Sequence, residues 1–496
     1  MSYRGHFAEM TGDEAAALID DGAFVGFSAF TPAGAVKATP RALAARAEAE
    51  HAAGRPFALR VLAGASSGPD IDERLARAGA IRWRAPYQSS PALRDAINGQ
   101  RCEFMDLHLS HVGQMLEFGF LGELDFAVVE AVDVTPDGRV YLSASSGVTP
   151  SLLKHADRIV VEINERHSRR LSEMHDVALL PNPPHRSPIP IHHPLDKIGT
   201  PFAVCDPARI VGVVRTNEPD GVPAAREADT VSAAIGGHIA EFLAGELRAG
   251  RVPPEFLPLQ AGVGNVANAV LAALASHASI PPFWMYTEVL QDSQIELMRS
   301  GKLLGASTSA LTLSESNVDE VYGDMDFFAP RMVIRPTELS NNPGVVRRLG
   351  VISVNTVLEA DIYGCANSTH ICGTRLMNGI GGSGDFVRNS YLSILVAPSV
   401  AKGGAVSSIV PMCSHVDHNE HSVQVLVTEQ GLADLRGLGP MERAARIIDR
   451  CAHPSYRDYL HRYTRESRLG HLRHDLRRVF ELHQNYLETG RMLPEQ

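Results

Sequence analysis

Apolar runs of strand length alternate with helical segments along this chain, and the alternation limits the folds open to it. Four runs are bounded by turn-forming residues, as buried strands are: "DGAFVGFSAF", "FALRVLAG", "ELDFAVVEAV" and "DRIVVEINE". Between the first two, the Ala-rich stretch "PRALAARAEAEHAAG" has charges at helical spacing, starts after Pro40 and stops at Gly54. Strands joined through helices usually pair in parallel, so the pattern predicts an α/β fold with mostly parallel sheets.

The length of 496 residues indicates two or three domains. The stretch Leu179–Gly199, "LLPNPPHRSPIPIHHPLDKIG", has too many prolines for a helix and is expected to be an extended connector. A second α/β region starts near the amphipathic helix predicted at "DTVSAAIGGHIAEFLAGELRAG", and "GHLRHDLRRVFELHQNYLETG" predicts a terminal helix. We place the boundary near residue 225, which gives domains over residues 1–225 and 226–496.

Charge and composition exclude several classes of protein. The net charge is -11 and the basic residues are scattered, so a nucleic-acid partner is not expected. The start lacks the apolar core of a signal peptide, and no run of about 18 apolar residues predicts a membrane span. Six cysteines in so long a chain do not form a disulfide framework. We therefore expect reduced thiols and a cytoplasmic protein.

Four small-residue loops are candidate binding elements. Glycine lets backbone amides approach a ligand closely, and α/β sheets bind ligands in loops at the carboxyl ends of parallel strands. None of the loops is a nucleotide fingerprint, and for any one loop alone a tight strand-to-helix turn is the favoured interpretation. Taken together they favour an acyl or phosphate-bearing ligand; they are "GASSGP" at 64–69, "GVGNVANAV" at 262–270, "NGIGGSGDF" at 378–386 and "AKGGAVSSIVPM" at 401–412.

Glu288 stands alone among large apolar residues in "PPFWMYTEVL". Such a strand is usually buried, and carboxylates are almost never fully buried without a partner. Two readings follow from the residues alone. Glu288 is either a structural residue paired with a buried arginine or a reactive group kept from water.

The segment His415–His421, "HVDHNEH", has a spacing that a zinc ion could use. It follows a predicted strand, however, and its spacing matches no standard zinc pattern. We favour a polar loop near the active cleft and predict no metal site. The absence of GxSxG argues against a serine hydrolase of the α/β-hydrolase type.

Several longer stretches together resemble one family. The chain is similar to the acetyl-CoA hydrolase/transferase family, which comprises class I CoA-transferases of the succinyl-CoA:acetate type. The likeness runs from "GFSAFTPAG" to "CAHPSYRDYL" through "QAGVGNVANAVLAAL", "YTEVLQDSQIELMRSGKLLGAS", "NNPGVVRRLGVISVN", "EADIYGCANSTH", "MNGIGGSGDFVRNSYLSI", "AKGGAVSSIVPM" and "VTEQGLADLRGL". It implies two CoA-transferase-type α/β domains with mostly parallel sheets facing a shared active-site cleft, the C-terminal one carrying the catalytic glutamate. It also implies a homodimer.

The resemblance assigns roles to individual residues. Glu288 is the expected nucleophile, which forms a glutamyl-CoA thioester, and the backbone amides of Val266 and Gly382 are expected to bind the oxyanion. Asn341 and Glu429 match polar active-site positions and are cast as orienting groups. The expected CoA contacts are Gly262, Val263, Gly264, Asn265, Val266, Asn378, Gly382 and Lys402. Coenzyme A enters as a substrate, and no other cofactor is expected.

Some assignments stay open at this point. Ser66 is a candidate for binding the substrate carboxylate, although a turn-forming serine explains it equally well. The expected reaction moves CoA from succinyl-CoA to acetate. The alternatives are acyl-CoA hydrolysis, transfer to propionate, butyrate or 4-hydroxybutyrate, or a non-catalytic CoA-binding or scaffolding protein. No single residue is chosen to read the distal carboxylate of succinate, for which the candidates are Arg215, Arg388 and Arg436.

Overall fold

The computed structural model describes residues 5–223 and 228–494 as two compact units. The first unit comprises Met1–Ala224, Met285–Arg299 and Leu303–Leu349, and the second comprises Ala225–Trp284, Ser300–Lys302 and Gly350–Gln496. The predicted domain boundary at residues 225 and 226 lies outside the described residues. The segment that carries Glu288 packs with the first unit although it follows that boundary in the chain.

The first unit is built on a nine-stranded sheet, and its long strands pair in parallel. The four apolar runs are strands β1, β2, β5 and β7, and the predicted helix between β1 and β2 is α2, Ala38–Ala52. The parallel α/β prediction is therefore confirmed here. The strands are β1 (Phe24–Phe27), β2 (Leu59–Ala65), β3 (Ile81–Tyr87), β4 (Glu103–Phe104), β5 (Phe126–Val134), β6 (Arg139–Leu142), β7 (Arg158–Asn164), β8 (Ala203–Val204) and β9 (Ile210–Thr216).

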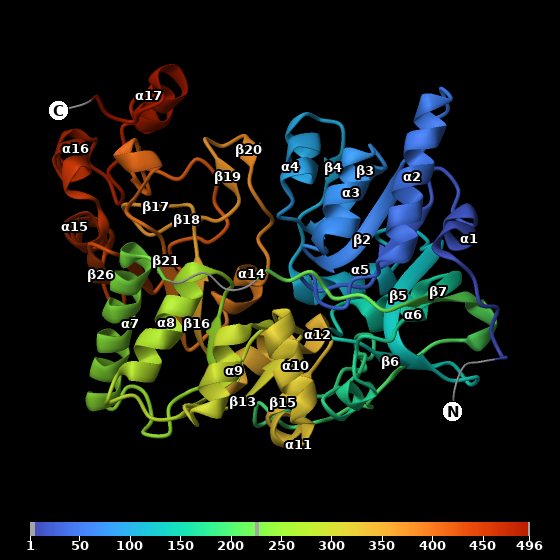
Figure 1. Ribbon diagram of the computed structural model, residues 1–496. Coiled ribbons are helices and arrows are strands. Elements are labelled where there is room, and N and C mark those ends of the chain that lie inside the picture. The colour runs from blue at the N-terminus through green and yellow to red at the C-terminus, as the bar shows by residue number, and fades with distance from the viewer. Residues whose placement is uncertain (1–4, 224–227, 495–496) are drawn as a thin grey trace. The chain divides into compact units, whose positions relative to one another are not determined.

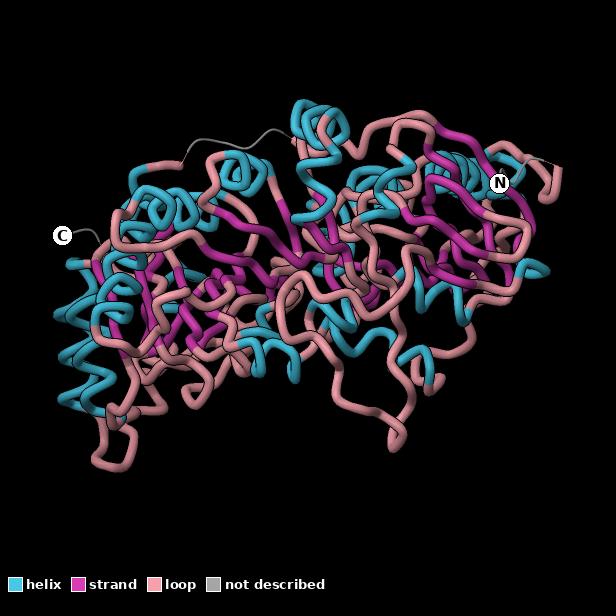
Figure 2. The backbone as a smooth tube through the Cα atoms, turned by 90° about the horizontal axis from the view of Figure 1, so that it is seen from below, coloured by secondary structure: helices cyan, strands magenta, loops and turns pink. Residues whose placement is uncertain are grey.

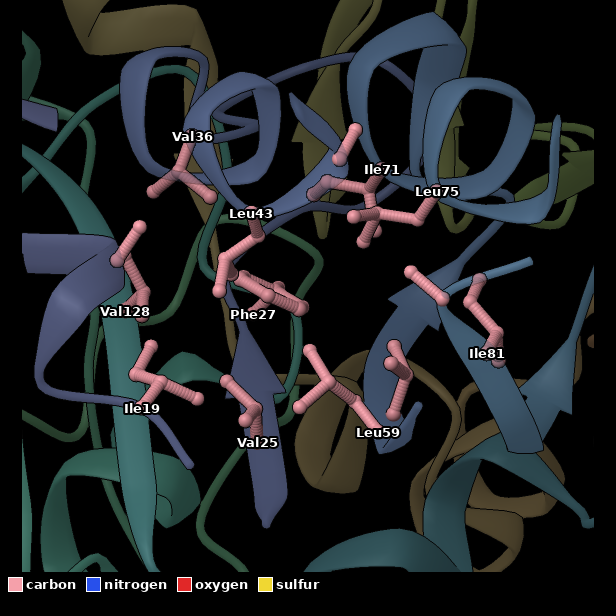
Figure 3. Packing of buried hydrophobic residues seen from close by; sticks show 14 of the residues in the cluster. Ile19, Val25, Phe27, Val36, Leu43, Leu59, Ile71, Leu75, Ile81 and Val128 are labelled. Carbon is pink, nitrogen blue, oxygen red and sulfur yellow. The ribbon is translucent and has the colours of Figure 1, made fainter. Parts of the chain in front are cut away.

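Helices cover both faces of this sheet, because its strands carry apolar side chains on both sides. One core lies between the sheet and helices α1 to α3, where Val25, Phe27 and Leu59 point toward Leu43 and Leu75 (Figure 3). The opposite core lies beneath α5 and α6 (Figure 1). The helices are α1 (Gly12–Ala17), α2, α3 (Arg74–Arg77), α4 (Pro91–Asn98), α5 (Val112–Glu117) and α6 (Thr149–His155).

The later segments of the first unit add a small parallel arrangement that carries Glu288. Strand β13 pairs in parallel with β15, and the short strands β12 and β14 pair directly after Glu288. The strands are β12 (Val289–Leu290), β13 (Leu303–Thr308), β14 (Ala310–Leu311) and β15 (Met332–Ile334), and of β11 (Phe283–Tyr286) the residues Met285 and Tyr286 belong to this unit. The helices are α9 (Asp292–Arg299), α10 (Glu315–Gly323), α11 (Met325–Phe328), α12 (Thr337–Ser340) and α13 (Pro343–Leu349).

The second unit contains strands in the order β10-β16-β21-β25-β26, parallel except for β26. Helices α15 and α16 bury one apolar core against β21 and β25, and α7 packs against α8 and contacts β25 (Figure 1). Helices flank the strands of the sheets (Figure 2). The main strands are β10 (Leu259–Ala261), β16 (Ile352–Thr356), β21 (Leu392–Val396), β25 (Val425–Thr428) and β26 (Gly431–Asp434).

The remaining elements of the second unit are short strands and flanking helices. The short strands are β17 (Glu359–Asp361), β18 (Ala366–Asn367), β19 (His370–Ile371), β20 (Arg375–Leu376), β22 (Val400–Ala401), β23 (Val406–Ser407) and β24 (Ile409–Val410). The helices are α7 (Thr230–Arg248), α8 (Asn265–Ser276), α14 (Ser383–Phe386), α15 (Pro440–Cys451), α16 (Pro454–Glu466) and α17 (Glu481–Thr489). Within the described part of the chain, every helix is too short or too polar to cross a bilayer. All six cysteines carry free thiols.

The terminal helix predicted over 470–490 is wrong in its first half, since α17 starts only at Glu481. Two buried tyrosines take the backbone groups that a helix would use. The Tyr363 hydroxyl donates to Arg473 O at 2.7 Å and accepts from Arg473 N at 2.8 Å. The Tyr463 hydroxyl accepts from Asp475 N at 3.1 Å. Tertiary hydrogen bonds thus override the helical pattern.

The proline-rich connector is extended as predicted, and a buried ion pair holds it. Arg335 and Asp176 are both fully buried and contact each other. Arg335 also donates to Pro194 O at 2.9 Å, and Asp176 accepts from Ile198 N at 2.8 Å and from Gly199 N. The guanidinium and the carboxylate therefore satisfy backbone groups that the connector cannot pair for itself.

Two glutamates in the buried strands β5 and β7 organise the turn from β1 into α2. Glu162 accepts hydrogen bonds from the backbone N–H groups of Lys37, Ala38 and Thr39 at 2.8–3.1 Å, so it caps the start of α2. Glu130 accepts from the Lys37 ammonium and, at 2.7 Å, from the Ser143 hydroxyl. The polar positions inside these apolar runs are therefore structural.

Lys37, Glu130, His167 and Asp220 form a buried charge cluster. Lys37 Nζ lies 3.0 Å from Asp220 Oδ1, and His167 Nε2 lies 3.2 Å from Glu130 Oε1. Burial opposes the charge on Lys37, yet the two carboxylates raise the pKa of its ammonium above the usual value. In the described residues, Glu130, His167 and Asp220 alone bring metal-type ligand atoms within 4.8 Å of one another. Because the Lys37 ammonium already contacts both carboxylates, it provides the positive charge that balances them.

We expect Lys37→Met to lower the free energy of unfolding by about 3–5 kcal/mol, because it leaves two buried carboxylates without their ammonium partner. Urea denaturation at pH 7 measures the loss. Lys154→Met is the matched control, because its ion pair with Glu117 is 43% exposed on the lysine side. There the loss should stay below about 1 kcal/mol. Equal losses in the two variants would contradict the role assigned to the cluster.

Candidate functional site

Glu288 follows β11 and is held by its backbone. Its carbonyl oxygen accepts hydrogen bonds from Ser309 N at 2.8 Å, from Ala310 N at 3.2 Å and from the Thr308 hydroxyl at 2.8 Å. The side chain is half-buried. The turn between β13 and β14 therefore fixes where the carboxylate starts, and the apolar strand ahead of it limits access of water to one side.

Asn341 orients the carboxylate of Glu288. Asn341 Nδ2 donates to Glu288 Oε1 at 2.5 Å. The amide is oriented by the carboxylate, which when ionised only accepts and would repel the amide oxygen, so Nδ2 faces Glu288 and Asn341 Oδ1 accepts from the Ser340 hydroxyl at 2.8 Å. Ser340 and Asn341 are both fully buried. The structure thus brings together two of the residues that the sequence predicted, Glu288 and Asn341.

A tyrosine fixes the strand that carries Glu288 to the helix that carries Asn341. Tyr286, at the end of β11, donates its hydroxyl to Leu339 O in α12 at 2.5 Å. Burial raises the pKa of this hydroxyl above its usual value, so it stays a donor. In the sequence, Tyr286 is one of the large apolar residues around Glu288, and that pattern alone does not predict this contact.

Ser66 lies at the end of β2 with a left-handed backbone, φ 45°, and its hydroxyl contacts that of Ser89. Thr31, after β1, is also left-handed at φ 60° and donates its N–H to Ala65 O at 2.6 Å. Strained non-glycine residues of this kind cluster at functional sites. An apolar cluster links this region to Val289, next to Glu288, through Phe30, Ala33, Ala65, Leu109, Ala144 and Ala310. Sequence reasoning missed Thr31, for which the only signal was a hydroxyl directly after a strand.

In the second unit, the loop Gly262–Val266 joins the carboxyl end of β10 to the start of α8. Gly262 N donates to Val354 O at 3.1 Å, which extends the parallel pairing with β16 by one step. Gly264 has φ 95°, and a Cβ there would meet open space, so its backbone alone demands glycine. Exposed amides between a strand end and a helix start suit an anionic ligand.

Glu429 and the loop that carries Lys402 lie at the carboxyl ends of β25 and β21. Ser399 N donates to Glu429 Oε2 at 2.7 Å, and the Ser399 hydroxyl donates to Oε1. Burial raises the pKa of Glu429, but the hydrogen bonds from Ser399 and Gln430 outweigh it and lower the pKa. Lys402 has φ 49° and lies over the Tyr486 ring, 4.9 Å from its centre. An ionised Glu429 therefore holds the loop ahead of Lys402.

Asn378 and Gly382 lie in the loop that leads into α14. The Ser383 hydroxyl donates to Ile380 O at 2.7 Å, and Gly382 O accepts from Asp385 N and Phe386 N at 3.0 Å. Gly381 is left-handed at φ 58°. The loop is therefore closed by its own hydrogen bonds rather than by a sheet.

Two of the three arginines considered for a distal carboxylate already pair with acids. Arg436 contacts Asp434 at 2.8 Å and Glu246 at 2.9 Å, and Arg215 contacts Glu165. Hydrogen bonds from Arg251 and Arg436 lower the pKa of the Glu246 carboxyl to about 2, although its burial acts in the opposite direction. Since these carboxylates compensate both guanidinium groups, neither arginine is favoured for reading a substrate.

Comparison with known proteins gives matches along the whole chain. Residues 1–215 match the family model for the acetyl-CoA hydrolase/transferase N-terminal domain, and residues 318–464 match the model for its C-terminal domain. The chain is 52% identical to a propanoyl-CoA:succinate CoA transferase of Escherichia coli K12 over 98% of this chain and 99% of that protein. It is 44% identical to a succinyl-CoA:acetate CoA-transferase of Clostridium kluyveri over 97% of this chain and 90% of that protein.

Solved structures share the fold at low sequence identity. RipA from Yersinia pestis aligns with a TM-score of 0.70 at 23% identity, over 93% of this chain and 98% of that one. A 4-hydroxybutyrate CoA-transferase from Porphyromonas gingivalis aligns with a TM-score of 0.61 at 20% identity, over 92% and 97%. The α/β architecture predicted from the sequence is therefore shared with solved proteins.

We expect Asn341→Asp to make the free energy of unfolding depend on pH. Two carboxylates would meet where Asn341 Nδ2 now lies 2.5 Å from Glu288 Oε1, so one would have a raised pKa in the folded state. The folded state then binds more protons than the unfolded state above about pH 4, and stability falls as pH rises through the raised pKa. Urea denaturation should show a loss larger by roughly 1–3 kcal/mol at pH 7.5 than at pH 5.

Asn342→Asp is the matched control for this measurement. The Asn342 side-chain oxygen accepts from Gly344 N at 3.0 Å and from Val345 N at 3.3 Å, and an aspartate can accept both hydrogen bonds. It loses the donation from Nδ2 to the backbone Glu338 O at 3.2 Å, but meets no second carboxylate there. Its loss should not grow toward pH 7.5. A loss of the Asn341→Asp variant that is the same at both pH values would contradict the close approach to Glu288.

Proposed function

The chain belongs to the acetyl-CoA hydrolase/transferase family, and from that premise we propose that it transfers CoA from succinyl-CoA to acetate through a glutamyl-CoA thioester on Glu288. It is an enzyme of the acyl-CoA:carboxylate CoA-transferase kind. The observation that carries the proposal is the hydrogen bond from Asn341 to the half-buried carboxylate of Glu288. A neutral amide orients that carboxylate without cancelling its negative charge, which suits a nucleophile.

The proposed reaction starts when a Glu288 oxygen attacks the thioester carbonyl of succinyl-CoA. The C–S bond breaks, the CoA thiolate leaves, and a mixed succinyl–glutamyl anhydride remains. The thiolate then attacks the glutamyl carbonyl and displaces succinate, which leaves a glutamyl-CoA thioester. Acetate attacks this thioester, and the same two steps in reverse produce acetyl-CoA and regenerate the carboxylate. No proton is consumed overall, so the thioester energy is retained.

Each tetrahedral intermediate carries an oxyanion that needs preorganised donors. We assign this role to the backbone amides of Val266 and Gly382. The CoA moiety is assigned to Gly262–Val266, Asn378, Gly382 and Lys402, with the Lys402 ammonium placed for a phosphate. The exposed glycine loop at the start of α8 and the left-handed backbone of Lys402 support this assignment. Ser66 is assigned to the substrate carboxylate, and Glu429 to orienting the loop of Lys402.

Propanoate is a second candidate for the acid partner of succinate. The higher identity, 52% against 44%, is to the relative named for propanoyl-CoA and succinate. Acetate and propanoate differ by one methylene, which changes discrimination by only about 1–3 kcal/mol. Acyl-CoA hydrolysis remains the alternative chemistry, in which water resolves the anhydride or the thioester. The homodimer implied by the resemblance and the cytoplasmic location expected from the composition stay predictions.

We expect the purified protein to convert succinyl-CoA and acetate to acetyl-CoA and succinate. Without an acid it should release little free thiol, because the two acyl intermediates are protected from water. Chromatography of the CoA esters and a thiol reagent follow the products in parallel. Propanoate in place of acetate tests the second candidate directly. Free thiol that appears at the same rate without any acid would identify a hydrolase and contradict the proposed transfer.

We expect Glu288→Gln to lower the transfer rate by at least about 10³-fold, because the amide cannot form the anhydride. CoA affinity, measured by calorimetry, should change little. The wild-type protein incubated with acyl-CoA should gain the mass of CoA less one water, and the variant should not. Glu296→Gln, on the exposed face of α9, is the matched control and should keep full activity. Normal turnover by Glu288→Gln would rule out the covalent mechanism.

A further inference from the structure

The "HVDHNEH" segment contacts two loops of the second unit through its polar side chains. On one side, Asp417 accepts from Ser368 N at 2.6 Å and from the Thr369 hydroxyl at 2.9 Å. His415 Nε2 lies 3.2 Å from the same carboxylate, and its ring packs 4.2 Å from that of His370. The aspartate therefore uses its oxygens to hold the loop that precedes β19.

On the other side, the buried His418 side chain reaches the loop of Gly382. Its backbone pairs with Ala366, with hydrogen bonds of 2.7 Å and 3.0 Å, so the residue has a fixed position. Its Nε2 atom lies 3.1 Å from the Ser383 hydroxyl oxygen. Both side chains are nearly inaccessible to water, with exposures of 5% and 7%.

The hydrogen-bond network fixes which group donates. Ser383 has a single hydroxyl proton, and that proton goes to Ile380 O at 2.7 Å. The Ser383 oxygen is therefore an acceptor toward His418, and His418 must carry a proton on Nε2. The pair forms a directed chain from His418 through Ser383 to Ile380.

This chain sets the shape of the turn that contains Gly382. The Ser383 hydroxyl closes the turn at Ile380 O, and Gly382 O is held by Asp385 N and Phe386 N at 3.0 Å. Gly381 takes the left-handed conformation that the turn requires, φ 58°. The Gly382 N–H belongs to the peptide unit that joins Gly381 to Gly382. This unit lies between two peptide units whose carbonyl oxygens, Ile380 O and Gly382 O, are both fixed, so it has little freedom to rotate.

We propose that His418 is a positioning residue that acts through Ser383 to aim the backbone amide of Gly382. The inference rests on the proposed function, in which that amide stabilises the oxyanion. An amide aimed in advance costs no reorganisation when the charge develops, and loss of one oxyanion donor lowers kcat by about 10²–10³-fold. A misaimed donor should lose part of that effect. Binding of the CoA ester should depend much less on it, because the other CoA loops stay intact.

The test compares kcat and KM among variants of both residues. We expect Ser383→Ala and His418→Leu to lower kcat by roughly 10–100-fold and to change KM for succinyl-CoA by less than about 3-fold. His418→Gln keeps an N–H close to the place of Nε2 and should restore most of kcat. The double variant should be no slower than the worse single variant, because both residues act on one turn.

His415→Leu is the matched control in the same segment, since its side chain is 40% exposed and pairs with Asp417 rather than with Ser383. It should keep kcat. Circular dichroism and CoA affinity of each variant check that the unit is folded, and Ser383→Ala carries the test if His418→Leu is not folded. Full kcat in Ser383→Ala, or an equal loss in His415→Leu, would overturn the positioning role while leaving the transferase proposal intact. A wild-type protein that transfers no CoA would overturn both.

Discussion

A carboxylate inside this protein must be given hydrogen-bond donors, and that constraint organises the first unit from its core to its site. Glu162 caps α2 by accepting hydrogen bonds from three backbone N–H groups, and Glu130 forms an ion pair with the ammonium of Lys37. Removing either set of donors would leave an uncompensated charge in a buried sheet, which costs several kcal/mol. The turn from β1 to α2, which carries the strained Thr31, therefore has its conformation imposed by charges on neighbouring strands.

The same constraint is met differently at Glu288. Here the neutral amide of Asn341, which also contacts Ser340, donates to the side chain. A guanidinium or ammonium would bind the carboxylate more strongly and would also draw off the charge that a nucleophile uses. The contrast between Lys37 beside Glu130 and Asn341 beside Glu288 separates a structural carboxylate from one suited to attack a carbonyl.

In the second unit, polar side chains fix the loops that carry the residues proposed to act on CoA. Glu429 holds Ser399 ahead of Lys402, and His418 holds Ser383 next to Gly382. In both cases a side chain at least half-buried fixes a glycine-rich loop by a hydrogen bond. Loops rich in glycine lose much conformational entropy when they become ordered. The hydrogen bonds to these side chains offset part of that cost and keep the amides in place before the ligand binds.

The sequence alone determined the elements whose signal is local. Apolar runs identified β1, β2, β5 and β7, the helical pattern identified α2 and α7, and the family motifs singled out Glu288 and Asn341. The tertiary structure decided what depends on distant partners. It stopped the terminal helix before Glu481, because Tyr363 and Tyr463 capture the backbone of 473–475. It also decided the donors to Glu130 and Glu288 and the contact between His418 and Ser383. The pairs Lys37–Glu130, Asn341–Glu288 and His418–Ser383 are 35–93 residues apart, and no local periodicity records which buried polar groups will meet.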